Sequence, residues 1–156
     1  MNTVQLDQCP FVAWRNGGGR TRELLAWPSA VDWQVRVSVA DIEADGPFSA
    51  FAGVDRCFAV LEGAGVVLSL PGGERRLACG DDAAAFPGEA APMCRLINGP
   101  TRDLNLMVRR GAGTASMHRT PLSSARWHGV FADGMLHWSD DPREALPPVT
   151  GWHLSV

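Results

Sequence analysis

The chain has 156 residues, 46% hydrophobic and 20% charged, so one compact domain can bury most of its apolar surface. The net charge is −3 and the fourteen basic residues, all Arg, form no basic block, which excludes the electrostatic footprint of a nucleic-acid-binding protein. No apolar run approaches the roughly 20 residues of a membrane-spanning helix, so no membrane partner is expected.

The N-terminal segment and the cysteines indicate the compartment. The first seven residues contain no basic region followed by an apolar run and therefore do not resemble a signal peptide, so we expect a cytoplasmic protein. The four cysteines are widely spaced, without a Cys-x-x-Cys pair, which favours free thiols over disulfides or a metal site. They are Cys9, Cys57, Cys79 and Cys94.

Short runs of apolar or alternating residues, separated by turns rich in Gly and Pro, recur along the whole chain. In order, the expected strands cover residues 3–6, 11–14, 33–40, 57–61, 66–70, 93–97, 104–109, 116–120, 125–131, 135–139 and 151–156. A spacing of roughly eight to twelve residues between strands predicts an all-β sandwich or barrel. No linker is long enough to separate a second unit, so we predict a single domain over residues 1–156.

Two of these strands alternate clearly with period two and place polar side chains on one face. In the strand at 33–40, Arg36 and Ser38 share a face that either meets solvent or lines a polar cavity. In the strand at 104–109, Asn105 and Arg109 share a face with Met107 and with Asp103, which precedes the strand, opposite the apolar face. These polar faces are the first candidates for a binding surface.

The glycine-rich stretch from Trp14 to Glu23 (WRNGGGRTRE) is the second candidate. Three consecutive glycines lose much backbone entropy on folding, which suggests that the fold needs their geometry. The backbone N–H groups of Gly17, Gly18 and Gly19 would suit an anion-binding concavity, and a flexible solvent-exposed turn is the alternative. No strand–loop–helix pattern and no Gly-Lys-Ser/Thr accompany the glycines, so a nucleotide phosphate loop is not predicted.

The middle of the chain resembles the cupin family. Residues 58–65 resemble the end of the first cupin motif, residues 77–82 the Gly-Asp turn that follows, and residues 86–98 the second motif. Metal-binding cupins carry a His pair and a Glu in the first motif and a His in the second, and those positions lack His here. The four histidines all lie in the C-terminal part of the chain, at positions 118, 128, 137 and 153. We therefore expect a cupin-like barrel with no metal and no other cofactor.

A narrower resemblance rests on several motifs in order. The WRNGGGRTRE stretch resembles the W-K/R-N-G-G-G-x-T-R-E signature of the HutD/Ves family. Residues 46–49, 51–56, 86–89 and 103–110 also follow that family's pattern. The resemblance implies a bicupin with two β halves and, in one branch, a protein that binds an intermediate of histidine degradation, such as urocanate or formylglutamate, and moderates expression of the pathway. Another branch is associated with cold and stress response.

A small anionic acid that carries an amide or imidazole would need particular side chains. Its carboxylate would bind a guanidinium fork, and its amide a side chain that both donates and accepts. The candidates are Arg22, Arg36, Arg56 and Arg109 for the carboxylate, Asn16 and Asn105 for the amide, and Glu23 and Glu89 as acceptors or as partners of an Arg. For Arg36, Arg56 and Arg109, an internal ion pair with Asp55, Asp103 or Glu89 is the alternative.

Three functions remain open from the sequence. The first is a regulatory protein that binds a small anionic metabolite without chemistry. The second is a metal-free isomerase or hydrolase with Glu23 or Glu89 as general base. The third is a cold- or stress-response interaction protein in which the six Trp residues form an exposed contact surface. A homodimer is compatible with any of them.

Overall fold

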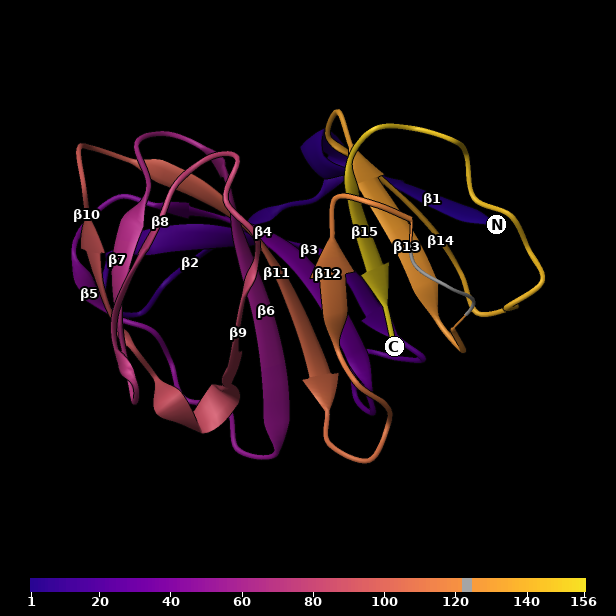
Figure 1. Cartoon of the computed structure of the whole chain (residues 1–156), viewed down its shortest axis with the longest axis horizontal. Helices are drawn as coiled ribbons and strands as arrows, with labels where there is room; N and C mark the ends of the chain where they lie inside the picture. Colours follow the sequence, from indigo (N-terminus) through magenta and orange to yellow (C-terminus); the bar gives the residue numbers. More distant parts are fainter. Residues whose placement is uncertain (122–124) are drawn as a thin grey trace.

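The computed structural model describes residues 1–121 and 125–156, and it is built almost entirely from β-strands (Figure 1). Three sheets lie in layers, with a six-stranded sheet between a four-stranded and a five-stranded sheet. Two short 3-10 helices, η1 (Leu6–Gln8) and η2 (Gly88–Ala90), are the helical elements of these residues. The described residues contain no helix of the length and apolarity needed to cross a membrane.

The central sheet carries residues from most of the first two thirds of the chain. Its strands pair antiparallel. In spatial order they are β2 (Phe11–Ala13), β3 (Gly19–Trp27), β4 (Val35–Ile42), β11 (Thr101–Arg109), β6 (Val54–Glu62) and β9 (Ala84–Pro87). Strand β3 begins inside the glycine-rich stretch, and its register with β4 shifts between Glu23 and Leu25.

The four-stranded sheet covers one face of the central sheet. In order its strands are β5 (Gly46–Pro47), β10 (Met93–Leu96), β7 (Val66–Leu70) and β8 (Gly73–Leu77). Apolar side chains from both sheets form one core here, including Ile42, Phe58 and Leu68. The cupin-like motifs are divided between this sheet and strands β6 and β9 of the central sheet.

The five-stranded sheet covers the other face. In order its strands are β1 (Asn2–Gln5), β14 (Met135–Ser139), β13 (His128–Ala132), β15 (Trp152–Ser155) and β12 (Ser116–His118). Strand β1, which begins the chain, pairs with β14 and so joins a sheet otherwise made of C-terminal strands (Figure 1). A second core lies beneath this sheet, where Trp127, Leu136 and Leu154 pack on Val37 and Leu106 of the central sheet.

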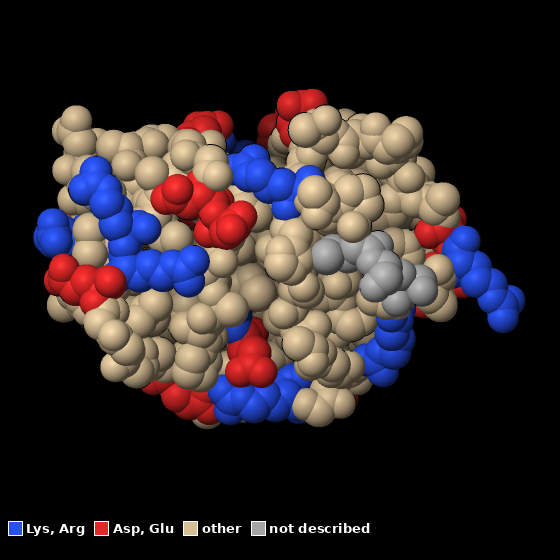
Figure 2. Space-filling model, in the orientation of Figure 1, with Lys and Arg blue, Asp and Glu red and all other residues tan. Residues whose placement is uncertain are grey.

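The all-β prediction and the two β halves are confirmed, in the form of a sandwich in which the halves share the central sheet; the strands of the described residues do not close a barrel. Acidic and basic side chains are interspersed on the face seen in Figure 2, with no continuous patch of one sign there. Among residues 1–121 and 125–156, no group of three or more His, Cys, Asp or Glu side chains is placed to hold a metal ion.

Candidate functional site

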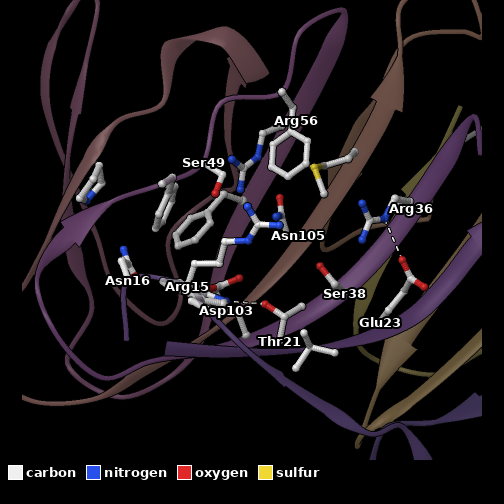
Figure 3. Close-up of a pocket in the computed structure, with 18 of the residues that line it drawn as sticks. Arg15, Asn16, Thr21, Glu23, Arg36, Ser38, Ser49, Arg56, Asp103 and Asn105 are labelled. Atoms are coloured by element: carbon white, nitrogen blue, oxygen red, sulfur yellow. Dashed lines mark hydrogen bonds and ion pairs between the residues drawn. The ribbon is translucent and has the colours of Figure 1, made fainter. Parts of the chain in front are cut away.

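A cavity of about 620 Å³ lies on the face of the central sheet that the four-stranded sheet partly covers (Figure 3). This volume is in the range that accommodates a small metabolite. The lining residues come from the β2–β3 hairpin, from β4, β11 and β6, and from the segment after β5. They are Val12, Ala13, Trp14, Arg15, Asn16, Thr21, Glu23, Arg36, Ser38, Ala40, Pro47, Phe48, Ser49, Phe51, Arg56, Phe58, Asp103, Asn105 and Met107.

The polar groups of the cavity wall come from neighbouring strands of one sheet. Successive side chains of a strand point to opposite faces of the sheet. Ser38 of β4, Asn105 of β11 and Arg56 of β6 therefore face the cavity, whereas the apolar residues that alternate with them face the five-stranded sheet. The pairing register places Asn105 opposite Ser38 on β4 and opposite Phe58 on β6. The alternation predicted for β4 and β11 is thus observed, and the shared polar face lines a cavity.

Arg56 is the most enclosed cation of the cavity, with 5% of its surface exposed. Its Nη2 donates to the side-chain oxygen of Asn105 over 2.8 Å when that amide is oriented to suit its neighbours, and the Asn105 nitrogen then donates to the Cys57 carbonyl over 3.3 Å. The rings of Phe48, Phe51 and Phe86 surround the guanidinium at 5.2 to 5.6 Å.

Two donors of this guanidinium remain unused. Within the described residues, Nε and Nη1 of Arg56 have no hydrogen-bond partner although both atoms are buried. Burial lowers the pKa of Arg56 to about 10, with the charge of Asp103 acting in the opposite direction, so the group stays protonated at neutral pH. Buried donors without a partner are rare in folded proteins, because each carries a desolvation penalty.

Asp103 faces the same cavity from β11 and is 2% exposed. Burial raises the pKa of its carboxyl to about 8, and the nearby charge of Arg56 offsets this only in part. Desolvation thus disfavours the ionised carboxylate. The enclosed position of Asp103 therefore favours the neutral acid.

The other end of the cavity carries a second guanidinium that is already paired. Nε of Arg36 donates to Glu23 over 2.8 Å, and the Arg36 guanidinium lies 5.2 Å from the Trp33 ring. Figure 3 shows this pair apart from Arg56, with Ser38 between the two ends. An Arg held in this way has lost side-chain entropy before any ligand arrives.

The glycine-rich turn contributes side chains to the cavity, and its glycines shape the backbone. The N–H of Gly17 donates to the Trp14 carbonyl (3.1 Å), and that of Gly18 to Oδ1 of Asn16 (2.9 Å). A Cβ on Gly19 would lie 2.5 Å from the Asp41 carbonyl, so only glycine fits there. The amides of Gly17 and Gly18 are therefore used within the turn, and the predicted anion-binding concavity is not formed by them.

Arg15 and Asn16, which flank these glycines, do line the cavity. In Figure 3 the side chain of Arg15 extends from the turn toward Asn105 and Arg56. The turn is fixed beside them by a hydrogen bond of 2.7 Å from the Trp14 indole to Thr21. The guanidinium of Arg15, which is exposed to solvent, is thereby directed at the same space as that of Arg56.

Six of the predicted site residues are not among those that line this cavity: the three glycines of the turn, and Arg22, Glu89 and Arg109. Arg22 projects from the face of β3 opposite Thr21 and Glu23, donates to the Leu6 carbonyl over 3.0 Å, and stacks on Phe11. Its position follows from strand period, since β3 already begins at Gly19. Arg22 lines a separate cleft of about 310 Å³.

Glu89 and Arg109 are held at the surface end of the sheet. Glu89 accepts from Arg110 and from the Gly53 backbone, which together lower its pKa to about 2. Arg109 donates to the Trp33 carbonyl over 2.7 Å and lies 4.3 Å from that ring. Arg110 also forms an ion pair with Asp55. It therefore pairs with two of the acids, Asp55 and Glu89, that the sequence suggested as partners for Arg36, Arg56 and Arg109.

The structure thus brings Asn16, Glu23, Arg36, Ser38, Arg56 and Asn105 together at one cavity. Sequence reasoning missed Arg15, Ser49, Phe48 and Phe51, which lie in turns and loops without periodicity. It also missed Phe58, which lies on strand β6. It considered Asp103 only as a partner for Arg. The alternation at 104–109 does place Asp103 on the face of Asn105, and the pairing of β11 with β4 agrees with this.

Comparisons with known proteins agree on one family. The family model described as HutD matches residues 6–139. An uncharacterized 21.2 kDa protein in the hutC 3' region of Pseudomonas putida is 41% identical over 109 residues, and Protein Ves of Citrobacter koseri is 35% identical over 112 residues. These matches cover 69% and 70% of this chain, and the chain spans 57% and 59% of the length of the two relatives.

Solved structures give the same result. HutD from Pseudomonas fluorescens SBW25 superposes with a TM-score of 0.80 and 28% identity, covering 99% of this chain and 92% of that one. Ectoine synthase from P. lautus, at 14% identity and a TM-score of 0.57 over 70% of this chain and 78% of that one, shares the fold alone. The resemblance carried by the WRNGGGRTRE motif is confirmed, and this chain belongs to the HutD family.

Proposed function

We propose that this protein binds a small carboxylate of the histidine-degradation pathway, formylglutamate or a urocanate-like acid, in the cytoplasm and serves as a regulatory binding protein without a metal or other cofactor. The observation that carries the proposal is the enclosed guanidinium of Arg56, whose Nε and Nη1 have no partner among the described residues. The similarity to HutD and to a protein of the hutC 3' region points to the pathway.

The geometry around Arg56 suits a carboxylate. A carboxylate binds a guanidinium bidentately along the edge that Nη2 shares with Nε or with Nη1. Asn105 accepts one N–H of Nη2, so the other N–H of Nη2 and the unpartnered donor beside it can bind the two carboxylate oxygens. Asn105 fixes the guanidinium from one side, and phenyl rings enclose it, so little side-chain entropy remains to be lost on binding. The enclosure by phenyl rings also strengthens the charge-assisted hydrogen bonds, because it lowers the local dielectric.

Further groups suit the rest of such a ligand. Arg15 extends from the turn into the same space and offers a fork for a second carboxylate, as in formylglutamate. Ser38 lies on the wall between Arg56 and the Arg36–Glu23 pair and offers a hydroxyl to an amide or an imidazole. Phe48 and Phe58 supply an apolar wall for the carbon skeleton.

Thermal unfolding with and without ligand tests the proposal. Saturation with N-formylglutamate or urocanate, at about a hundred times the dissociation constant, is expected to add about 2.7 kcal/mol to the stability and so raise the Tm. Arg56→Met is expected to abolish the shift, and Arg56→Lys to weaken it, because Lys keeps the charge without the fork. Arg75→Met, at an exposed position of β8, is the matched control and should keep the full shift.

The result that contradicts the proposal is equally clear. If millimolar N-formylglutamate and urocanate leave the Tm of a ligand-free preparation unchanged, neither is the ligand. If Arg56→Met shows the same shift as the wild type, Arg56 does not bind the carboxylate.

An enzymatic function has one specific observation in its favour, the presence of Glu23 in the cavity. As general base it would first have to leave Arg36, with which it forms an ion pair of 2.8 Å. Glu89, the other candidate base, lies outside the cavity. Conversion of N-formylglutamate, followed by chromatography and lost in Glu23→Gln, would favour the enzyme; an unchanged ligand after long incubation would oppose it.

The alternative of a stress-response contact surface built from Trp has no such support. All six indoles are in the described part of the chain, where they are buried or half-buried. The large apolar side chains exposed there are Met1, Phe11, Val12, Val31 and Met93.

A further inference from the structure

Asp103 is a buried carboxyl at the cavity to which the proposed carboxylate binding assigns no role. It lies two residues before Asn105 on the same face of β11 and is 2% exposed. None of the ion pairs among the described residues includes Asp103; the neighbouring pairs join Arg102 to Asp41 and Arg36 to Glu23. An enclosed carboxylate without an ion pair is unstable relative to the neutral acid.

The charged and titratable groups around Asp103 come from four elements. Arg56 on β6 favours its ionisation, whereas Asp41 on β4 opposes it. Asp41 stays anionic because the hydrogen bond from Arg102 lowers its pKa. Cys94 on β10 is neutral, since burial raises the pKa of its thiol to about 12. Arg15 reaches the cavity from the β2–β3 turn, where it is exposed to solvent.

We propose that Asp103 stays a neutral acid in the cavity and donates its O–H to an acceptor on the bound anion. This inference rests on the proposed function and specifies the ligand class further. The ligand carries a carboxylate for Arg56 and, within a few bonds, a neutral acceptor such as an amide carbonyl or an unprotonated ring nitrogen.

The same arrangement selects against free amino acids. The cavity contains three guanidinium groups, those of Arg15, Arg36 and Arg56, and its two carboxyls are the neutral Asp103 and Glu23, which is bound to Arg36. A ligand ammonium would therefore meet net positive charge and find no free carboxylate. N-Formylglutamate is accepted and glutamate, which differs by an exposed ammonium, is rejected.

Binding of an anion also favours the neutral form of Asp103, because a second negative charge beside it would be repelled. Below about pH 7 the Asp103 carboxyl already carries its proton, so the affinity for the anion does not depend on pH. Above the pKa that Asp103 has in the ligand-free protein, each binding event must take up a proton, and the affinity falls about tenfold for each further pH unit.

Isothermal titration of N-formylglutamate from about pH 6 to about pH 9 tests the inference. The wild-type dissociation constant is expected to be constant up to about pH 7.5 and to rise by about fivefold to tenfold between pH 8 and pH 9. Asp103→Asn, which keeps a donor that cannot ionise, is expected to bind at pH 7 and to lose the pH dependence. Asp55→Asn, on the opposite face of the same sheet, is the matched control and should keep the wild-type profile.

The outcomes separate this inference from the proposed function. A wild-type affinity that is constant to pH 9, or an Asp103→Asn profile equal to that of the wild type, overturns the donor role. Glutamate binding as tightly as N-formylglutamate overturns the predicted selectivity. Failure of N-formylglutamate to bind the wild type contradicts the formylglutamate assignment.

A measurement without ligand decides the protonation state independently. In protein labelled with ¹³C at the Asp carboxyls, the signal missing from Asp103→Asn identifies Asp103. Its titration midpoint is expected above pH 7. If that carboxyl is already ionised at pH 6, the inference is wrong whatever the ligand.

Discussion

The two faces of the central sheet have opposite chemistry although the same strands form both. On the face toward the five-stranded sheet, Val35, Val37, Leu104 and Leu106 are at most 1% exposed and pack into one apolar core. On the other face, the residues between them include Ser38, Asp103 and Asn105, which are buried at a cavity. One face thus stabilises the fold by burial of apolar area, and the other holds polar groups at an energetic cost.

This contrast between the faces explains how a small sheet protein maintains a binding site. A buried guanidinium with unused donors weakens the fold by itself, so the surrounding structure must be stable enough to tolerate it. Here the apolar core on the opposite face supplies that stability, and the strand period keeps the two roles apart residue by residue. Exchanging residues between the faces should therefore affect stability and binding differently.

The largest effect is expected from the apolar face. Leu106→Ala removes a fully buried side chain and should lower the free energy of unfolding by about 2 to 5 kcal/mol. Asn105→Ala, on the cavity face, should lower it by only about 1 kcal/mol, because water in the cavity can replace the hydrogen bonds that Asn105 makes with Arg56 and with the Cys57 carbonyl. Urea unfolding of the two variants measures the contrast, and equal losses would contradict the division between the faces.

An intermediate effect is expected from Asp103. The pKa of the Asp103 carboxyl is higher in the folded than in the unfolded protein. The carboxyl therefore adds to the free energy of unfolding below about pH 4, and this contribution is lost as the pH rises to about 8. Asp103→Asn lacks this loss, so the variant should exceed the wild type by roughly 2 to 4 kcal/mol at pH 8 and approach it near pH 4. Urea unfolding across this pH range is the measurement, and a difference independent of pH would contradict it.

The smallest effect is expected at the surface network of Glu89. Its pKa is lowered to about 2, mainly by Arg110, so its stabilisation is present above about pH 4.5 and disappears as the pH falls toward 2. Because the pair is exposed, Glu89→Gln should change the Tm little at pH 7. The Tm shift given by N-formylglutamate should be unchanged, and its loss would place Glu89 in the binding site.

Most of the fold could be predicted because strand period is local. Residues 66–70 and 135–139 were predicted with their observed bounds, and the alternation in β4 and β11 identified both faces correctly. The start of β3 was not predicted, since its first residue belongs to the glycine-rich stretch. That boundary sets the parity of the strand and decides that Glu23 faces the cavity while Arg22 faces away.

The site could be predicted only in part, because strand register and burial in the tertiary structure decide which side chains meet there. Arg56 and Asn105 were identified by type and spacing, yet nothing local distinguishes Arg109 from Arg110 as the partner of Glu89. That choice depends on the register between β6 and β11, which brings Arg109 opposite Val54. The raised pKa of Asp103 likewise depends on burial. The alternation along a strand predicts which face a residue is on, but it does not predict how deeply that residue is buried.

The pairing of β1 with β14 has a consequence for how the chain folds. Residues 2–5 lie beside residues 135–138, so this ladder closes a loop of more than a hundred residues. Contacts so distant in sequence raise the contact order, and proteins with high contact order fold slowly. During synthesis, β1 is made first and has no ladder partner until β14 has been made, and for that interval β1 is open to pairing with another chain.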